Sequence, residues 1–348
     1  MIGGGAVLSL LILAAAAFRH FTGSARVVKV GAPGLGPGYR LHIESSHYDL
    51  WRKTFYATGI TVVRDSLSAG SDTARARTRS WFTLPAVEAR GVNLFAVRRG
   101  ALTAEEIRFE RPKIRVFLDR KTASAHPGAR KMPHEVLMSS NTRVRIGAVR
   151  IIDGDIQYAE QSYTGVRPGT FRFANFNATA RNIGNEQDRR REPCVIDVQT
   201  RLADSGLLKA TFNYDLSSKT TKMDYRAVMG KMDMTALNKL LVDLKGVEVK
   251  EGTIDSLSAD IKINGDLATG TVRIPYHNLK FKMLDKETHE QDPGDKLATF
   301  MYSKESSESN PEDDDDQIKE IEIRRQRLPS VSLIKFVWET VREGALRS

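Results

Sequence analysis

The chain has 348 residues, of which 41% are hydrophobic and 28% charged, so it can form a packed globular body and extensive disorder is not expected. Its net charge of +10 is unevenly distributed: positions 285–320 hold 13 acidic and four basic side chains, and the rest of the chain therefore carries about +19. The single cysteine, Cys194, excludes an intrachain disulfide framework and any multi-cysteine zinc or iron–sulfur site.

Residues 2–18 form an uncharged, largely apolar segment that is followed by Arg19. A helix of about 20 apolar residues spans a bilayer, and this segment is slightly shorter than that. We expect residues 1–20 to be either a signal peptide, cleaved after the small residues Ala14–Ala16, or an uncleaved membrane anchor. Anchors of exported proteins carry basic residues on their cytoplasmic side, so we also expect the natural chain to begin upstream of Met1.

The next segment is rich in glycine and proline. Positions 31–38 read Gly-Ala-Pro-Gly-Leu-Gly-Pro-Gly, a composition that sustains neither a helix nor a central strand. We therefore predict a linker over residues 21–38. A phosphate-binding loop is excluded because no Gly-Lys-Ser/Thr follows the glycines.

Alternation of apolar and polar residues dominates residues 39–285. Ile261 and Ile263 alternate with polar side chains and precede an Asn-Gly hairpin turn, after which the pattern continues. The same period of two predicts strands at residues 39–45, 54–63, 82–89, 107–118, 144–152, 155–158, 171–180, 195–202, 207–214, 222–229 and 279–283. About a dozen strands with few helices between them predict a mostly antiparallel sheet.

Two short helices are predicted between the strands, at residues 93–99 and 234–244. Asp233 or Thr235 is the expected N-cap of the second helix, and the leucines of that helix fall on one side. Helices of this length and amphipathic character are expected to cap or cross a sheet.

The chain ends in an acidic segment and an amphipathic helix. Residues 286–329 include the acidic run Glu312–Asp316 and are predicted to be a disordered loop. Residues 330–348 are predicted to form a helix that closes an end of the sheet, lies on a membrane or docks a partner. The predicted apolar side of this helix carries Val331, Ile334, Trp338, Val341 and Ala345.

Residues typical of catalysis do not form a recognisable motif. His134-Glu135 begins like a zinc-protease helix, but Met138 stands where that pattern requires the second histidine. No Gly-x-Ser-x-Gly elbow occurs, and Cys194 is interpreted as an ordinary strand residue. We therefore expect no enzymatic activity, no cofactor and no metal.

The basic remainder of the chain raises the question of a nucleic-acid partner. Arg75, Arg77 and Arg79 alternate along the chain, as side chains on the solvated face of a strand do. Such a face also attracts anionic lipid headgroups. Because the N-terminal segment indicates export, we expect a membrane surface and no nucleic acid.

A sheet with one apolar face needs a cover for that face, which a second sheet, helices or an apolar ligand can provide. The residues alone leave two architectures open. One is a sandwich of two sheets, which the number of strands favours. The other is a single curled layer whose inside is an apolar groove.

Several segments follow one another in an order that is typical of one family. Residues 81–97 and 102–117 combine a strand, a short helix and a strand that is broken at Arg111-Pro112-Lys113-Ile114. Residues 144–158 read as a strand, a glycine turn and a return through Tyr158. In this order they resemble the AsmA-like proteins of Gram-negative envelopes.

Two further segments support the resemblance. Residues 225–241 contain the run Met-Asp-Met-Thr-Ala-Leu-Asn and are followed by Gly246 and a hairpin at 252–265, which is similar to the family's strand, helix and hairpin. Residues 332–344 resemble the terminal helix of Bacteroidota-type members. The resemblance covers residues 39–285 and the last nineteen residues.

The resemblance implies a mostly β fold: a long curled antiparallel sheet over residues 39–285, called a β-groove, with a few short capping helices, an N-terminal transmembrane helix and a C-terminal amphipathic helix. It also implies a single-pass inner-membrane protein whose body lies in the periplasm. Such a protein binds or helps to transfer phospholipid, or another acyl lipid, in outer-membrane biogenesis or homeostasis. The side chains expected to line the groove are Leu257, Ile261, Ile263, Val272, Ile274 and Phe281.

One alternative from another functional class stays open. In it, the protein is a structural or scaffolding component of the envelope, its sheet is covered by protein, and its C-terminal helix docks an envelope protein. A closed sandwich without a continuous apolar channel favours this alternative.

Overall fold

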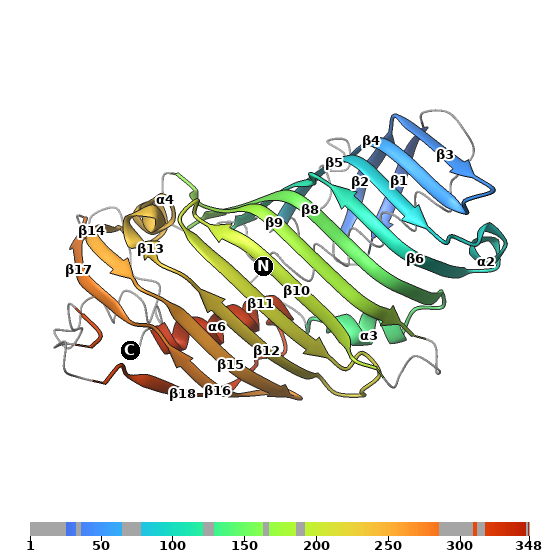
Figure 1. The fold of residues 1–348 in the computed structure, drawn as a ribbon. Helices are drawn as coiled ribbons and strands as arrows, with labels where there is room; N and C mark the ends of the chain where they lie inside the picture. The colour runs from blue at the N-terminus through green and yellow to red at the C-terminus, as the bar shows by residue number, and fades with distance from the viewer. Residues whose placement is uncertain are drawn as a thin grey trace.

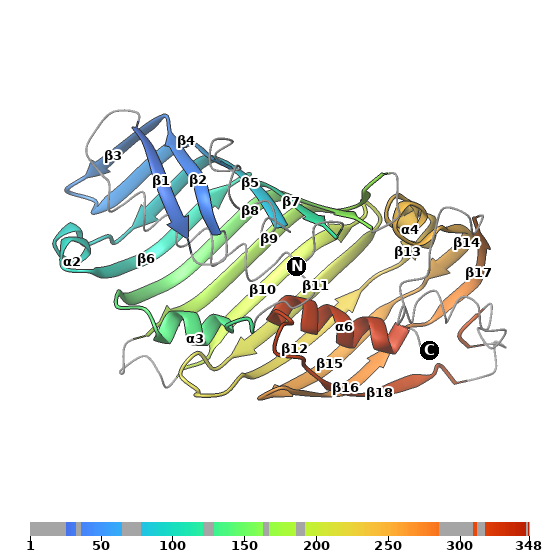
Figure 2. The same cartoon turned by 180° about the vertical axis from the view of Figure 1, so that it is seen from behind.

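The computed structural model describes residues 26–32, 36–64, 78–120, 129–162, 167–185, 192–284, 309–311, 317–345 and 347. They form a 15-stranded sheet, a 3-stranded sheet and a few short helices, which confirms the expected β-rich body. The large sheet is a single layer that curls toward the side on which helices α3 (Pro133–Met138) and α6 (Leu333–Ala345) lie (Figure 1, Figure 2). We call this side the concave face and the opposite side the convex face.

The strands of the large sheet follow the order β1-β2-β4-β5-β6-β8-β9-β10-β11-β12-β15-β16-β18, with β3 beside β4 and β7 between β5 and β8; the small sheet has the order β13-β14-β17. The strand bounds are β1 (Arg26–Ala32), β2 (Gly36–Ile43), β3 (Ser45–Asp49), β4 (Thr54–Arg64), β5 (Thr78–Arg90), β6 (Ala101–Glu110), β7 (Lys113–Asp119), β8 (Arg143–Gln161), β9 (Gly169–Gly184), β10 (Cys194–Leu202), β11 (Gly206–Tyr214), β12 (Lys222–Met229), β13 (Met232–Asp233), β14 (Val247–Ile254), β15 (Leu257–Asn264), β16 (Leu267–Arg273), β17 (Tyr276–Met283) and β18 (Glu320–Gln326).

The large sheet is mixed: its pairs are antiparallel, as mostly predicted, except that β6 and β7 run parallel to β8. The predicted strand 107–118 is two strands, β6 and β7, which both pair antiparallel with β5 and parallel with β8. Arg111, whose φ is +48°, and Pro112 interrupt the run between them. The connection from β7 to β8 contains α3 and is long enough for the crossover that a parallel pair requires.

The predicted linker at residues 21–38 is wrong over 26–32 and 36–38, where β1 and β2 form an antiparallel pair. Pro37 is tolerated because it lies in β2 before the pairing with β4, which begins at Tyr39, and because the β1–β2 register is irregular near the turn. Residues 21–25 and 33–35 lie outside the described residues.

The predicted disordered loop at 286–329 is wrong at its end, where β18 pairs antiparallel with β16. Ile321 and Ile323 alternate there with charged residues and are 5% and 2% exposed. This short period-two pattern predicts a strand, but it was overlooked because it follows an acidic segment. Residues 285–308 and 312–316 lie outside the described residues.

Two of the short helical segments, α2 and η3, begin at side-chain caps. Asn93 Oδ1 accepts a hydrogen bond of 3.0 Å from the amide of Ala96 at the start of α2 (Leu94–Arg98). Asp233 Oδ1 accepts one of 2.9 Å from the amide of Thr235, which confirms Asp233 as a cap. The helix predicted at 234–244 is a 3₁₀ turn, η3 (Met234–Leu237), that continues into α4 (Asn238–Lys245).

The C-terminal helix is confirmed as α6, and the predicted apolar side is right in part: Val331 is buried and Val341 and Ala345 pack against the core, whereas Trp338 is exposed. Phe336, Thr340 and Gly344 are the residues of α6 that are buried. The hydroxyl of Thr340 pairs with that of Tyr225, and a Cβ at Gly344 would lie 2.4 Å from Cβ of Val272. The helix thus approaches the sheet closely through small residues, whereas the apolar stripe in the sequence contains Trp338, which is 52% exposed.

The expected membrane anchor at residues 1–20 lies outside the described residues. Within the part of the chain that the structure describes, no helix is long and apolar enough to cross a bilayer.

Replacement of Gly344 tests the close approach of α6. Gly344→Val should lower the free energy of unfolding by about 1–3 kcal/mol, because the new side chain overlaps Val272 and pushes the helix from the sheet. Gly230→Val is the matched control, since a Cβ there meets no atom within 4 Å, and its effect should stay within about 0.5 kcal/mol. Denaturant unfolding measures both, and equal effects would contradict the packing described.

Candidate functional site

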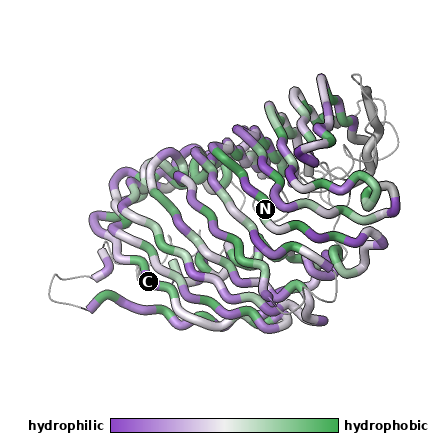
Figure 3. The backbone as a smooth tube through the Cα atoms, turned by 45° about the vertical axis from the view of Figure 1, so that its right-hand side comes forward, coloured by the Kyte–Doolittle hydropathy of each residue, from purple (hydrophilic) through white to green (hydrophobic). Residues whose placement is uncertain are grey.

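Two rows of apolar residues cross the concave face from β4 to β18. Residues that stand opposite one another in paired strands share a face of the sheet, so the strand registers define each row. The alternation that produces them is visible along the strands (Figure 3). The first row is Phe55, Ala89, Ile107, Val149, Ala180, Ile196, Phe212, Tyr225, Ile261, Gly270 and Ile323. The second row is Ala57, Val87, Phe109, Ile151, Ala178, Val198, Ala210, Ala227, Ala259, Val272 and Ile321.

The rows are least covered in their middle. At the two ends of the first row Phe55 and Ile323 are 1% and 2% exposed, and α6 covers the second end. On β10 and β11 the apolar side chains Ile196, Val198 and Phe212 are only partly buried. Among the described residues of the two rows, those on the middle strands β10 and β11 are therefore the least covered; Figure 2 shows where these strands lie in the sheet.

Side chains of different size line this middle part. Phe212 of the first row lies beside Tyr225, with ring centroids 5.5 Å apart. In the second row Val198 stands between Ala178 and Ala210, so large rings adjoin small aliphatic side chains. The surface is apolar throughout and offers no hydrogen-bonding side chain within these rows other than the hydroxyl of Tyr225, which is already bonded to α6.

The structure brings some of the sequence-predicted groove residues together and not others. Ile261 and Val272 belong to the two rows, and Ile263 is buried on the same strand, but at Val272 the cover is α6. Leu257 is partly buried at the start of β15, and Ile274 is 3% exposed just after β16. Phe281 lies apart in the small sheet, where it pairs with Val249.

Sequence reasoning missed the least covered residues, Ile196, Val198 and Phe212. Each lies in a strand that the alternation predicts, so their orientation to one face was available as a local signal. Which strands stand beside them, and where the helices end, depends on long-range pairing that one sequence does not reveal.

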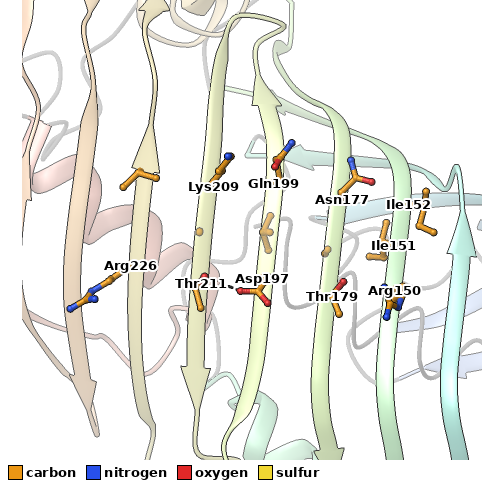
Figure 4. Close-up of a pocket in the computed structure, with 14 residues that line it drawn as sticks. Arg150, Ile151, Ile152, Asn177, Thr179, Asp197, Gln199, Lys209, Thr211 and Arg226 are labelled. Carbon is orange, nitrogen blue, oxygen red and sulfur yellow. Dashed lines mark hydrogen bonds between the residues drawn. The ribbon is translucent and has the colours of Figure 1, made fainter.

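The convex face carries a shallow depression of about 520 Å³ over β8 to β12, lined by charged and polar side chains together with Ile152 and Val228 (Figure 4). Two of its arginines pair with carboxylates: Arg150 with Glu106 at 2.6 Å, and Arg226 with Asp260 at 2.7 Å. A hydrogen bond from Arg181 lowers the pKa of Asp197. These exposed ion pairs are those of a solvated sheet surface and contribute little stability each.

The described part of the chain shows no arrangement of side chains that is ready for metal binding or for nucleophilic catalysis. There, no three His, Cys, Asp or Glu side chains lie close enough to hold a metal. Cys194 is 3% exposed, and burial raises the pKa of its thiol to about 12, which keeps the thiol protonated at neutral pH.

A scan against protein-family models finds no match, and no curated protein matches the chain. The resemblance to AsmA-like proteins therefore stays a prediction, and the concave face must be interpreted from its own geometry.

His134 joins α3 to the sheet. It is 3% exposed, and its Nδ1 lies 2.6 Å from Oη of Tyr214 on β11. Desolvation lowers the pKa of the imidazole, and the nearby charges of Glu135 and Asp215 only partly oppose this. The buried ring is therefore neutral when α3 is in place.

This burial predicts a loss of stability in acid. Below about pH 6.5 the unfolded chain binds a proton at His134 that the folded chain does not, so the free energy of unfolding should fall as the pH drops. His134→Gln, which keeps a polar group near Tyr214, should reduce this slope. Denaturant unfolding at about pH 7.5 and about pH 5.5 measures it. An unchanged slope in the variant would assign the acid sensitivity to other groups.

Proposed function

We propose that the protein binds phospholipid, or helps to transfer it, along the concave face and performs no chemistry of its own. The observation that carries this proposal is the pair of uninterrupted apolar rows across eleven neighbouring strands, of which the middle is only partly covered. The accessible part is the middle patch at Ile196, Val198 and Phe212, and neighbouring apolar side chains left partly uncovered mark a candidate site for an apolar partner.

The dimensions of the rows fit acyl chains. Neighbouring strands are about 4.8 Å apart, so eleven strands extend about 50 Å. One leaflet of a bilayer has a hydrocarbon thickness of about 15 Å, half of the roughly 30 Å core. The accessible part of the rows on β10 and β11 offers a site for part of an acyl chain, and the rows beyond it are buried toward both ends.

The polarity of the two faces also fits a lipid. Acyl chains would contact the aliphatic and aromatic side chains of the rows, while the headgroup stays in water at the rim of the sheet. Small residues such as Ala178 and Ala210 leave room for a chain beside the ring of Phe212. The buried positions Ile261 and Val272 are assigned to the covered end under α6.

The cellular setting belongs to the same proposal. The apolar segment 2–18 supports a single-pass inner-membrane anchor, with the body in the periplasm and a role in outer-membrane biogenesis or homeostasis. The order of the strand and helix motifs supports an AsmA-like protein, and the strand broken at Pro112 into β6 and β7 is part of that pattern.

One observation favours the scaffolding alternative. Trp338 projects from α6 and is 52% exposed although the helix is docked through its other side. Exposed tryptophan is common at centres of protein interfaces, so α6 is a candidate docking site for an envelope protein. Trp338→Ala should then reduce complex formation and leave lipid contact at the middle of the rows unchanged.

Lipid contact can be measured at single residues of the full chain. A photo-crosslinking amino acid at position 212, on the concave face, should form adducts with phospholipid in the native membrane. The same group at the adjacent position 211 should not, because Thr211 lies on the convex face and bonds to Asp197 at 2.9 Å. Mass spectrometry of the adducts identifies the lipid.

A charge in the second row should remove this contact. Val198→Asp should lower the adduct yield at position 212 at least about 10-fold. Desolvation of the new carboxylate by a bound acyl chain costs several kcal/mol, and a tenfold loss of affinity corresponds to only about 1.4 kcal/mol. Gln199→Asp, on the same strand but the convex face, is the matched control and should have no effect. If Val198→Asp folds with the thermal stability of the control and keeps the parent yield, lipid does not bind there.

A further inference from the structure

The β3–β4 turn and α2 lie at one end of the molecule (Figure 1), and three large apolar side chains on these two segments are exposed. Trp51 is 97% exposed, Leu50 76% and Phe95 75%. We call residues 49–53 and 93–99 the apical tip. Single exposed apolar residues are ordinary, but three of this size on two adjoining turns need an explanation.

The apical tip is held in place by hydrogen bonds. Asp49 Oδ1 accepts from the amides of Trp51 and Arg52 at 2.9 and 3.0 Å, which fixes the turn. The amide of Val92 donates to the carbonyl of Lys53 at 2.9 Å and joins the turn to the segment before α2. These hydrogen bonds fix the backbone that carries the exposed apolar side chains.

Cationic side chains surround the apolar ones. Arg52, Lys53 and Arg99 are exposed, and the only acidic partner close to Arg52 in the described residues is Asp49, at 3.9 Å. Within the same part of the chain Lys53 and Arg99 form no ion pair. The convex face differs, because there the arginines next to the depression pair with carboxylates.

This combination favours a lipid bilayer over a protein as the partner. A stable protein interface buries about 800 Å² on each partner, more than a turn and one short helix can supply. Tryptophan prefers the bilayer interface, and basic side chains near the surface attract anionic headgroups. A few inserted side chains with flanking cations are sufficient for reversible attachment to such a surface.

We propose that the apical tip inserts Leu50, Trp51 and Phe95 into the interface of a bilayer that contains anionic phospholipid, with Lys53 and Arg99 at the headgroups. The attachment does not depend on lipid binding to the concave face, although the first row begins at Phe55, two residues beyond Lys53. If both proposals hold, the rows start at the membrane surface.

The test uses Trp51 as the reporter in the full chain. Trp81→Phe and Trp338→Phe leave it as the only tryptophan of the three. The protein is reconstituted into vesicles of phosphatidylcholine with or without phosphatidylglycerol, and brominated lipid is the quencher. With phosphatidylglycerol, Trp51 emission should shift to shorter wavelength and be quenched. A chain with Trp338 alone should show neither change.

The charges are tested in the same assay. Lys53→Gln with Arg99→Gln should lower the ratio of inserted to free tip about 30-fold, since each basic group near an anionic surface contributes a factor of about five. Lys209→Gln on the convex face is the matched control and should have no effect. Because all of these positions are exposed, thermal unfolding should be unchanged in each variant.

Three results would overturn the inference. The first is Trp51 emission that stays water-like and unquenched in anionic vesicles. The second is equal quenching without phosphatidylglycerol, which would remove the role of the cations. The third is a blue shift that grows with protein concentration in the absence of vesicles, which would show that the apical tip binds a second copy of the chain. The crosslinking of lipid at position 212 is a separate measurement and is unaffected by any of these results.

Discussion

The register between neighbouring strands is the constraint on which the other features of this molecule depend. A one-residue slip between β10 and β11 would move Ile196 and Phe212 to opposite faces and break both apolar rows. Each strand contributes only a short local alternation, and the pairing of eleven strands turns these into continuous surfaces. The helices cover parts of a face that the pairing has already made apolar.

Electrostatic interactions are used differently on the two faces. The convex side carries exposed ion pairs, whose individual contribution is small. On the concave side Arg325 of β18 bonds to Glu339 and Glu343 of α6, both at 2.9 Å, and these groups are about one-fifth exposed or less. This cluster and the Tyr225–Thr340 contact attach α6 to the sheet at two places. Polar interactions therefore fix the helix that covers this end of the apolar rows.

The sequence predicts what is local in this fold. Most strands follow from period-two alternation, and the cap at Asp233 follows from side-chain chemistry. The parallel pairing of β6 and β7 with β8 was not predictable, because it depends on which strands pair over a long sequence separation. The contacts of Thr340 and Gly344 with the sheet were missed because neither residue is strongly hydrophobic. Both lie there because the helix backbone comes close to the sheet, and a hydrophobic pattern does not reveal this. For the candidate site, the sequence placed Ile261 and Val272 on the apolar face. It did not show that Val198 is more accessible, because that depends on where the helices pack on the sheet.

The last strand and the last helix come from the final 29 residues, yet they cover a face built much earlier in the chain. During synthesis from the N-terminus, β15 and β16 can pair before β18 and α6 exist. Until then Val272 faces water and the edge of β16 has no partner, which makes the incomplete chain prone to aggregation. The longest-lived folding hazard of this protein is thus at its C-terminal end, and a chain that stops before residue 320 keeps it permanently.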